Sequence, residues 1–193
     1  MEINNIFSDW LGEEKLNLNL EILQKHIYDF QKTDPEGVVF SNQNGWQSKP
    51  ESVCHKENFD LFRQANFFAK EISKMLDLTQ ELKLLEYWYN INYHCSFNMA
   101  HTHIRSSNNI MTGVFYVKVP ENSGNIIFQT ADKLRQVSYD SNVKSYKPYT
   151  SSKFIQIPKE NTLLFFPSSL EHFVEPNNNT QERISISFNY GYK

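Results

Sequence analysis

The sequence predicts a mainly β domain with N-terminal helices, an α+β chain whose strands form a sandwich or jelly roll. In the first 80 residues, apolar side chains recur at three- and four-residue steps, as on one face of a helix. After residue 82 the segments become short, rich in β-branched and aromatic residues, and separated by turns. That second pattern is typical of antiparallel strands.

Two helices are predicted before residue 80. The first spans about 20–31, with Asn19 as a candidate cap and 34–37 as its stop. The second begins at Asn58, whose side chain can accept from the free amides of the first turn. Between them, SNQNGWQS (41–48) is expected to form a polar turn segment.

Seven or eight short strands are expected in the rest of the chain, from the segments 82–93, 111–119, 125–130, 153–157, 162–166, 172–176 and 183–192. No Pro/Gly/Ser-rich or single-charge linker divides the 193 residues, and a chain of this length can bury roughly 70% of its surface in one core. We therefore expect a single domain, 1–193, in which 1–80 supply helical support and loops and 82–193 form the jelly-roll core.

The balance of charge excludes several classes of partner. Lys and Arg number 19 against 22 Asp and Glu, and no basic stripe is present, so sequence-general nucleic-acid binding is not expected. Neither a membrane span nor a signal peptide is recognisable, which predicts a cytoplasmic protein without a membrane partner. The two cysteines, Cys54 and Cys95, are expected to be free thiols.

Three of the six histidines form a candidate metal site. His101 and His103 are two residues apart, and in an extended segment such residues point to the same side. His172 follows a predicted strand and a proline turn, where it could supply a third ligand. Two of the other histidines, His26 and His55, are expected to have surface or capping roles.

The last predicted strand has one polar and one apolar face. Alternation in RISISFNY places Arg183, Ser185, Ser187 and Asn189 on the polar face. A buried arginine is costly unless it meets an anion, and its planar fork suits a carboxylate. Arg183 could bind such a ligand or pair with Glu175 or Glu182. A hairpin turn near 177–179 is expected to bring Arg183 alongside the strand of His172.

These motifs, in this order and spacing, resemble the 2-oxoglutarate/Fe(II)-dependent oxygenases. More narrowly, SNQNGWQS, HTH, TGVFYVKVP, FFPSSLEH and RISISFN resemble a family of small oxygenases of bacteria and their viruses. The resemblance covers roughly residues 40 to 190. It implies a double-stranded β-helix, a jelly roll, with Fe(II) and 2-oxoglutarate as cofactor and cosubstrate. The implied reaction consumes O₂, releases succinate and CO₂, and hydroxylates a protein side chain or a small metabolite.

The resemblance also implies roles for individual residues. His101 and His172 match metal ligands, and Arg183 matches the arginine that binds the far carboxylate of 2-oxoglutarate, with Ser185 beside it. Tyr116 stands where related prolyl hydroxylases have a tyrosine that binds the same carboxylate. Asn92 shares one strand face with Trp88 and Asn90 and is a candidate cofactor or substrate contact.

One position departs from the superfamily pattern. His103 stands where Asp or Glu usually completes the two-histidine, one-carboxylate set, so the third ligand is either His103 or a recruited carboxylate such as Glu171 or Glu175. Three-histidine iron sites also occur in cupin-type dioxygenases that do not use 2-oxoglutarate, which is a second hypothesis. A third is a non-catalytic jelly-roll binding module with incidental histidines. The loops expected to shape specificity are 41–56, 104–110 and 130–152, the last a candidate lid.

Overall fold

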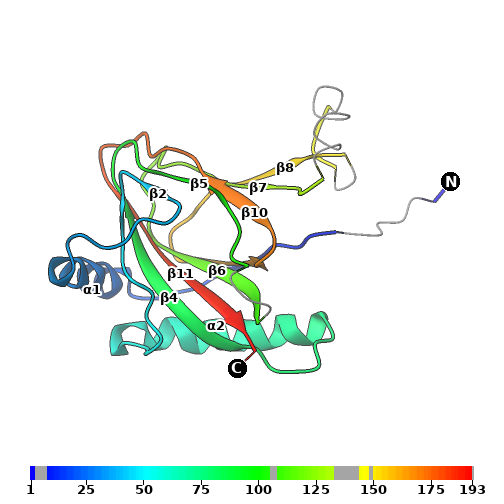
Figure 1. Ribbon diagram of the computed structural model, residues 1–193, viewed down its shortest axis with the longest axis horizontal. Coiled ribbons are helices and arrows are strands. Elements are labelled where there is room, and N and C mark those ends of the chain that lie inside the picture. The colour runs from blue at the N-terminus through cyan, green and yellow to red at the C-terminus, as the bar shows by residue number, and fades with distance from the viewer. Residues whose placement is uncertain (3–7, 105–107, 133–143, 148–149, 193) are drawn as a thin grey trace.

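The computed structural model describes residues 1–2, 8–104, 108–132, 144–147 and 150–192. Within them, two antiparallel sheets face each other, and two helices cover the outer face of the larger sheet (Figure 1). The strand order of the larger sheet is β1 (Gly12–Lys15), β9 (Thr162–Pro167), β6 (Asn109–Lys118), β11 (Arg183–Gly191), β4 (Lys83–Asn92) and β3 (Trp46–Gln47). The order of the smaller sheet is β2 (Asn42–Gln43), β5 (Phe97–His101), β10 (Glu171–Val174), β7 (Ile126–Gln129) and β8 (Lys153–Gln156).

Helix α1 (Leu20–Thr33) begins as the sequence predicts. The side chain of Asn19 accepts a hydrogen bond from the backbone N–H of Ile22, and Leu23 and Ile27 are buried on the apolar face. This face packs against the larger sheet, which stabilises a helix that would be marginal in isolation.

Helix α2 (Phe59–Met75) starts differently from the expectation. A short 3-10 helix, η1 (Lys56–Asn58), precedes it, so Asn58 already has helical backbone angles (φ −94°, ψ −1°) and makes no side-chain cap. Its amide instead donates to the Tyr89 hydroxyl at 2.6 Å. The prediction that Asn58 caps the helix was wrong because the extra turn directs this side chain into the core.

The long central strands divide their residues between a core and a cavity. The core between the helices and the larger sheet includes Tyr87, Tyr89 and Ile91 of β4 and Ile184, Ile186, Phe188 and Tyr190 of β11. The alternate residues, which face the smaller sheet and line a cavity, include Trp88, Asn90 and Asn92 of β4 and Arg183, Ser185 and Ser187 of β11. The predicted alternation of the last strand is therefore confirmed, and it fixes which side chains reach the site.

The first 80 residues also contribute strands, although they were expected to supply only helices and loops. β1 joins the larger sheet beside β9. The segment 41–48, predicted as a turn, contains β2, which pairs with β5, and β3, which pairs with β4. Asn44, with φ 58°, makes the bend between them. The rim segment, residues 38–47, thus links the two sheets at one end of the sandwich.

The connection between β10 and β11 crosses from one sheet to the other. β10 pairs with β5 and β7, whereas β11 pairs with β4 and β6. The expected hairpin that would place Arg183 alongside the strand of His172 was therefore wrong. Arg183 approaches the histidines across the sandwich, because turn residues indicate where a chain bends but not which sheet the next strand joins.

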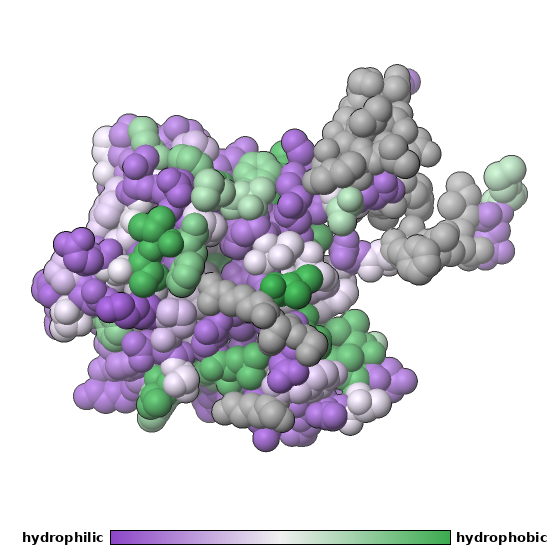
Figure 2. Space-filling view, in the orientation of Figure 1, coloured by the Kyte–Doolittle hydropathy of each residue, from purple (hydrophilic) through white to green (hydrophobic). Residues whose placement is uncertain are grey.

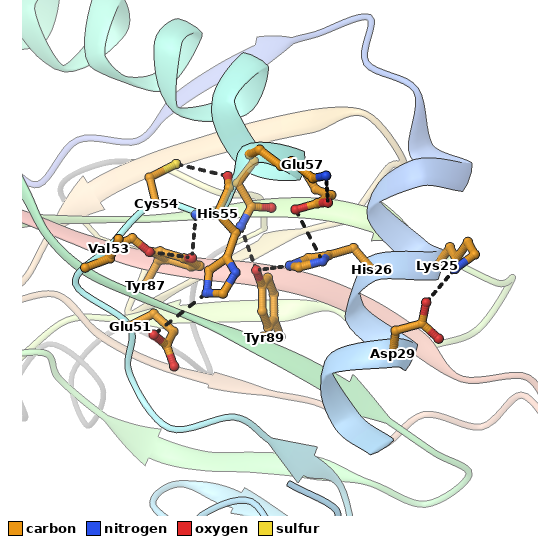
Figure 3. Close-up of polar contacts among 12 residues, drawn as sticks. Lys25, His26, Asp29, Glu51, Val53, Cys54, His55, Glu57, Tyr87 and Tyr89 are labelled. Atoms are coloured by element: carbon orange, nitrogen blue, oxygen red, sulfur yellow. Dashed lines mark hydrogen bonds and ion pairs between the residues drawn. The ribbon is translucent and has the colours of Figure 1, made fainter. Parts of the chain in front are cut away.

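A second group of histidines lies behind β4, on the helix side of the larger sheet (Figure 3). His26 of α1 has Nε2 2.9 Å from the Tyr89 hydroxyl and Nδ1 3.6 Å from a Glu57 carboxylate oxygen. The ring of His55 packs 5.3 Å away. These contacts give His26 and His55 a structural role in holding α1 and η1 against the sheet.

The cysteines, the helices and the predicted loops can also be compared with the expectations from the sequence. Cys54 is half-buried, Cys95 is exposed and both thiols are free, as expected. None of the described helices is long and apolar enough to cross a membrane. Residues 105–107, 133–143 and 148–149, which belong to the predicted specificity loops and lid, lie outside the described residues.

Candidate functional site

A cavity of about 380 Å³ lies between the two sheets. The larger sheet supplies its polar floor through β4, β6 and β11, and the smaller sheet supplies the histidines through β5 and β10. Apolar side chains from both sheets, among them Val114, Ile126 and Phe166, also line the cavity. The predicted metal ligands and the predicted cosubstrate ligands all line this one cavity.

The structure brings the three predicted metal ligands together. His101 ends β5 directly opposite His172 of β10, and His103 lies two residues beyond the strand. One ligand atom from each residue lies within 4.8 Å of the other two. Strand pairing therefore holds two of the ligands, and the backbone N–H of His103, which donates to the Ser168 carbonyl at 2.9 Å, holds the third.

Hydrogen bonds at Nδ1 leave Nε2 available on two of the rings. Nδ1 lies 2.7 Å from the Met99 carbonyl in His101 and 2.9 Å from the Leu170 carbonyl in His172. A carbonyl oxygen only accepts, so Nδ1 carries the proton and Nε2 keeps its lone pair. This is the usual arrangement around a metal-bound histidine.

The spacing of the Nε2 atoms fits a shared metal ion. Nε2 of His103 lies 3.3 Å from Nε2 of His172, and two nitrogens bound to one ion at about 2.1 Å lie roughly 3 Å apart. Burial, and then the neighbouring His101, lowers the pKa of His172 to about 3. His172 is therefore neutral near pH 7, which is the form that binds metals. Trp88 stacks on His103 with ring centroids 5.5 Å apart, fixing the plane of that ring.

No carboxylate joins this cluster among the residues that the structure describes. Glu171 accepts a hydrogen bond from Gln129, and Glu175 accepts two from Asn125. Neither of the two recruited carboxylates considered from the sequence therefore lies with the histidines. Of the two candidates for the third ligand, a recruited carboxylate or His103, only His103 lies with His101 and His172 among the described residues.

Arg183 is a buried cation without an acidic partner in the described part of the chain. Its side chain is 3% exposed, and Nη1 donates to the carbonyls of Ser123 at 3.3 Å and Gly124 at 3.1 Å, while Nε has no partner. Gly124 has φ +88°, and a Cβ there would lie 2.2 Å from the Glu175 carbonyl. Only glycine therefore allows the tight loop that supports the guanidinium.

The considered ion pairs of Arg183 do not form. Glu182 instead accepts from Lys118 at 2.8 Å and from the Tyr28 hydroxyl. Burial lowers the pKa of Arg183 and the nearby Tyr116 partly offsets this, so an anion that entered the cavity would relieve an unfavourable buried charge.

Tyr116 and Ser185 lie beside each other in the part of the cavity that contains Arg183. They are cross-strand neighbours on β6 and β11, and both are buried and line the cavity. Burial raises the pKa of Tyr116 to about 12, so its hydroxyl is neutral and able to donate. Together, Arg183, Tyr116 and Ser185 thus offer several hydrogen-bond donors to one anionic group.

Asn92 is part of a polar chain between the sheets. Its amide donates to Asn98 Oδ1 at 3.2 Å, and the amide of Asn98 donates to Ser41 Oγ at 3.2 Å. Ser41 Oγ lies 3.5 Å from Nε2 of His101. Asn92 lines the cavity with its amide already hydrogen-bonded to a neighbour.

Several cavity residues were missed from the sequence. Phe40, Ser41 and Gln47 belong to the rim segment, and Met99 belongs to β5, neither of which was assigned as strand. The motif SNQNGWQS marked the segment, but only the strand register shows which of its side chains face the cavity.

Comparisons with known proteins extend this picture. Residues 86–189 match the model of a family described as "Putative 2OG-Fe(II) oxygenase", whereas no curated protein matches the chain. A prolyl-4-hydroxylase of Pseudomonas putida is similar in structure, with 13% identity, 95% of this chain and 92% of that chain covered, and a TM-score of 0.64. A viral collagen prolyl hydroxylase of Paramecium bursaria Chlorella virus-1, in complex with 2-oxoglutarate, has 12% identity, 93% and 94% coverage, and a TM-score of 0.62.

A third similar structure is HygX of Streptomyces hygroscopicus with nickel, 2-oxoglutarate and hygromycin B bound. It has 11% identity, 95% and 83% coverage, and a TM-score of 0.60. At these identities the likeness establishes the fold, the double-stranded β-helix that the sequence predicts. The family model spans more than half of the chain, so the protein belongs to the 2OG-Fe(II) oxygenase family and is an oxygenase that depends on Fe(II) and 2-oxoglutarate.

Proposed function

We propose that the protein hydroxylates a protein side chain or a small metabolite, with His101, His103 and His172 holding Fe(II). In the same proposal, Arg183, Tyr116 and Ser185 bind the far carboxylate of 2-oxoglutarate. The observation that supports it most is a buried guanidinium with an unpartnered Nε, in the same cavity as three converging histidines. Fe(II) with bound 2-oxoglutarate supplies the activation of O₂.

The chain's own residues position the cosubstrate and keep water out. The planar fork of Arg183 is suited to a carboxylate, and its two hydrogen bonds to loop carbonyls fix its orientation. The neutral hydroxyl of Tyr116 donates to the same group. The apolar lining residues Val114, Ile126 and Phe166 reduce the access of water to the cavity, so the charge of the guanidinium acts more strongly than it would in solvent.

The class of substrate is open between a polypeptide and a small molecule. The fold neighbours include collagen and prolyl hydroxylases as well as an enzyme with hygromycin B bound. Both classes of substrate are therefore compatible with this scaffold.

Anaerobic titration of Fe(II) and 2-oxoglutarate into metal-free protein tests the proposal. We expect the visible charge-transfer band of a keto acid chelated to iron, and its loss in His172→Ala and in Arg183→Ala. Arg63→Ala, which removes an exposed arginine of α2, is the matched control and should behave as wild type. A normal band in both site variants would contradict the assigned roles.

A second candidate function is a cupin-like three-histidine dioxygenase that does not use 2-oxoglutarate. His103 in place of a carboxylate is the observation that favours it, and the family match supports the first proposal instead. The two differ in stoichiometry: O₂ consumption without any release of succinate would support the cupin-like reaction.

A further inference from the structure

The cavity has two chemically different ends. One cross-strand row on its floor runs Gln47, Asn90, Ser185, Tyr116 over β3, β4, β11 and β6. Neighbouring strands lie about 4.8 Å apart, so the backbone of Gln47 is roughly 10 Å from that of Ser185 and roughly 14 Å from that of Tyr116. Arg183 points toward the β6–β7 loop, which places the proposed 2-oxoglutarate carboxylate at the end far from Gln47.

Gln47 is a largely buried residue with a carboxamide that is accessible from the cavity. It is 4% exposed and lines the cavity, yet within the described residues its carboxamide makes no hydrogen bond, although its backbone carbonyl accepts from Val38 at 2.9 Å. Next to it, the amide of Asn90 donates to Ser187 at 3.0 Å, and Oδ1 of Asn90 accepts no hydrogen bond from the described chain. These carboxamide atoms are not among the fully buried polar atoms that lack a partner in the described residues, so they are open to the cavity and accessible to a ligand.

The backbone around Gln47 is held rigidly. Trp46, which points to the helix side, donates from Nε1 to the Asp34 carbonyl at 2.8 Å. Gly37 has φ +58°, and a Cβ there would lie 2.3 Å from the Gln47 carbonyl. The backbone position from which the Gln47 side chain enters the cavity is therefore fixed, which favours a binding role.

The charge around Gln47 selects among possible ligands. No Asp, Glu or Lys is among the described residues that line the cavity, so an ammonium group would find no counter-charge. A carboxylate would be attracted to Arg183 at the opposite end. A carboxamide offers one acceptor and two donors, and the group it matches best is another uncharged amide.

The mouth beside Gln47 is apolar. Phe40 and Met99 line the cavity while remaining 49% and 47% exposed, and Val39 next to them is 73% exposed. Figure 2 shows apolar patches on this face of the molecule, around β2 and the chain leading into it. An apolar portion of a ligand could cover them once its amide reached Gln47.

We propose that Gln47, assisted by Oδ1 of Asn90, binds an uncharged peptide or carboxamide group of the substrate and orients the substrate beside the metal. This inference rests on the proposed function, because it requires 2-oxoglutarate to occupy the Arg183 end. Gln47 is then a specificity-determining residue: it favours substrates that carry an amide next to an apolar group.

Three small probes that differ in charge test the inference: N-acetyl-L-leucinamide, L-leucinamide and N-acetyl-L-leucine. The protein is loaded with Mn(II) and 2-oxoglutarate, and probe binding is followed by the paramagnetic broadening of the probe's NMR signals. We expect the uncharged probe to bind wild type at least fivefold more tightly than the ammonium and carboxylate probes.

Variants at one position separate recognition from folding. Gln47→Leu should weaken the uncharged probe at least fivefold, and Gln47→Glu should shift the preference toward the ammonium probe. Gln43→Leu, on β2 and outside the cavity lining, is the matched control and should bind as wild type. The affinity for 2-oxoglutarate should stay the same in all three variants, because Gln47 is at the opposite end.

Several outcomes overturn the inference. Equal binding of the uncharged probe to wild type and Gln47→Leu would do so, as would no measurable binding to wild type or a preference of wild type for a charged probe. A loss of 2-oxoglutarate affinity in Gln47→Leu would place Gln47 in the cosubstrate site instead. If wild type binds neither Mn(II) nor 2-oxoglutarate, the proposed function itself fails and the inference falls with it.

Discussion

At the scale of a single residue, Arg183 is a proposed binding group whose burial lowers the free energy of unfolding. Its charge is buried, its pKa is lowered by burial, and its Nε lacks a partner. Replacing a buried charged group with an apolar residue of similar volume is often neutral or stabilising.

We therefore expect Arg183→Met to raise the free energy of unfolding of the ligand-free protein by about 1 kcal/mol. The same variant should lose the thermal stabilisation that 2-oxoglutarate gives the metal-loaded wild type. Urea denaturation and thermal melts with and without 2-oxoglutarate measure the two effects. A less stable variant would mean that the hydrogen bonds to Ser123 and Gly124 outweigh the cost of the buried charge.

Tyr116 is expected to contribute one hydrogen bond to the same carboxylate. Its burial and raised pKa keep the hydroxyl protonated, so Tyr116→Phe removes a donor with little change in shape. A net hydrogen bond to a charged group is worth about 1.5–3 kcal/mol, so the affinity for 2-oxoglutarate should fall roughly tenfold or more. Calorimetric titration of the metal-loaded protein measures this, and an unchanged affinity would remove Tyr116 from the site.

At the residue scale, the candidate metal-binding and anion-binding residues were easier to predict than the residues that only the fold brings to the cavity. His101, His103, His172 and Arg183 are residue types with few structural uses in an apolar setting, so their spacing was informative. Gln47 could not be found in this way, because an isolated glutamine in a polar segment has no distinctive pattern. Only its pairing with Asn90 of β4 shows that it faces the cavity.

At the scale of elements, β6 contains a position where the packing of two strands depends on a missing side chain. A Cβ added at Gly113 would lie 2.1 Å from the Phe188 ring and 2.9 Å from the Leu164 carbonyl. The Phe188 ring is fully buried and packs against the rings of Phe62 and Phe165, so it has little room to move.

Gly113→Ala should therefore destabilise the protein by about 1–3 kcal/mol through overpacking. Gly12→Ala in β1 is the control, because its Cβ would meet the nearest atoms at an ordinary 3.7 Å and should change stability much less. Urea denaturation of the two variants decides the matter: equal losses would show that overpacking at Phe188 is not the cause.

Long elements were predictable, whereas short ones were not. Helix α1 and the strands β4, β6 and β11 each bury a continuous face, so the period of their apolar residues was readable. β2 and β3 contain two residues each, too few to show any period, and they exist because β4 and β5 offer them partners. The crossing from β10 to β11 was mistaken for a hairpin for the same reason, since pairing partners distant in sequence leave no local signal.

At the scale of the whole molecule, the site is assembled between two sheets, and the larger sheet has a hydrophobic core on each of its faces. One core joins the helices to the outer face of the larger sheet, and a smaller one, with Tyr116, Phe128 and Phe166, lies between the sheets. His26 is partly buried and packs against Tyr89 of the helix-side core, so its protonation contributes to the pH dependence of stability from a position remote from the cavity.

Burial lowers the pKa of His26; the charge of His55 lowers it further, while Glu57 and Asp29 partly offset these effects. The unfolded chain keeps the ordinary histidine pKa of about 6.5 and therefore binds more protons than the folded chain below that pH. The contribution of His26 to stability is thus fully present above about pH 6.5 and is lost as the pH falls. Carboxylates with lowered pKa, such as Glu182, lose their contribution only at lower pH. The lowered pKa of His172 acts in the same pH range as that of His26, so only the difference between wild type and a His26 variant measures the contribution of His26.

We expect the free energy of unfolding of the metal-free protein to decrease between pH 7.5 and pH 5.5, and to decrease less in His26→Gln. Glutamine can still hydrogen-bond to Tyr89 but cannot take up a proton, so it isolates the titration from the contact. His94→Gln is the matched control, because His94 is exposed and its replacement should leave the pH dependence of wild type unchanged. Urea denaturation at both pH values measures the slopes, and equal slopes in wild type and His26→Gln would show that the acid sensitivity of the fold arises elsewhere.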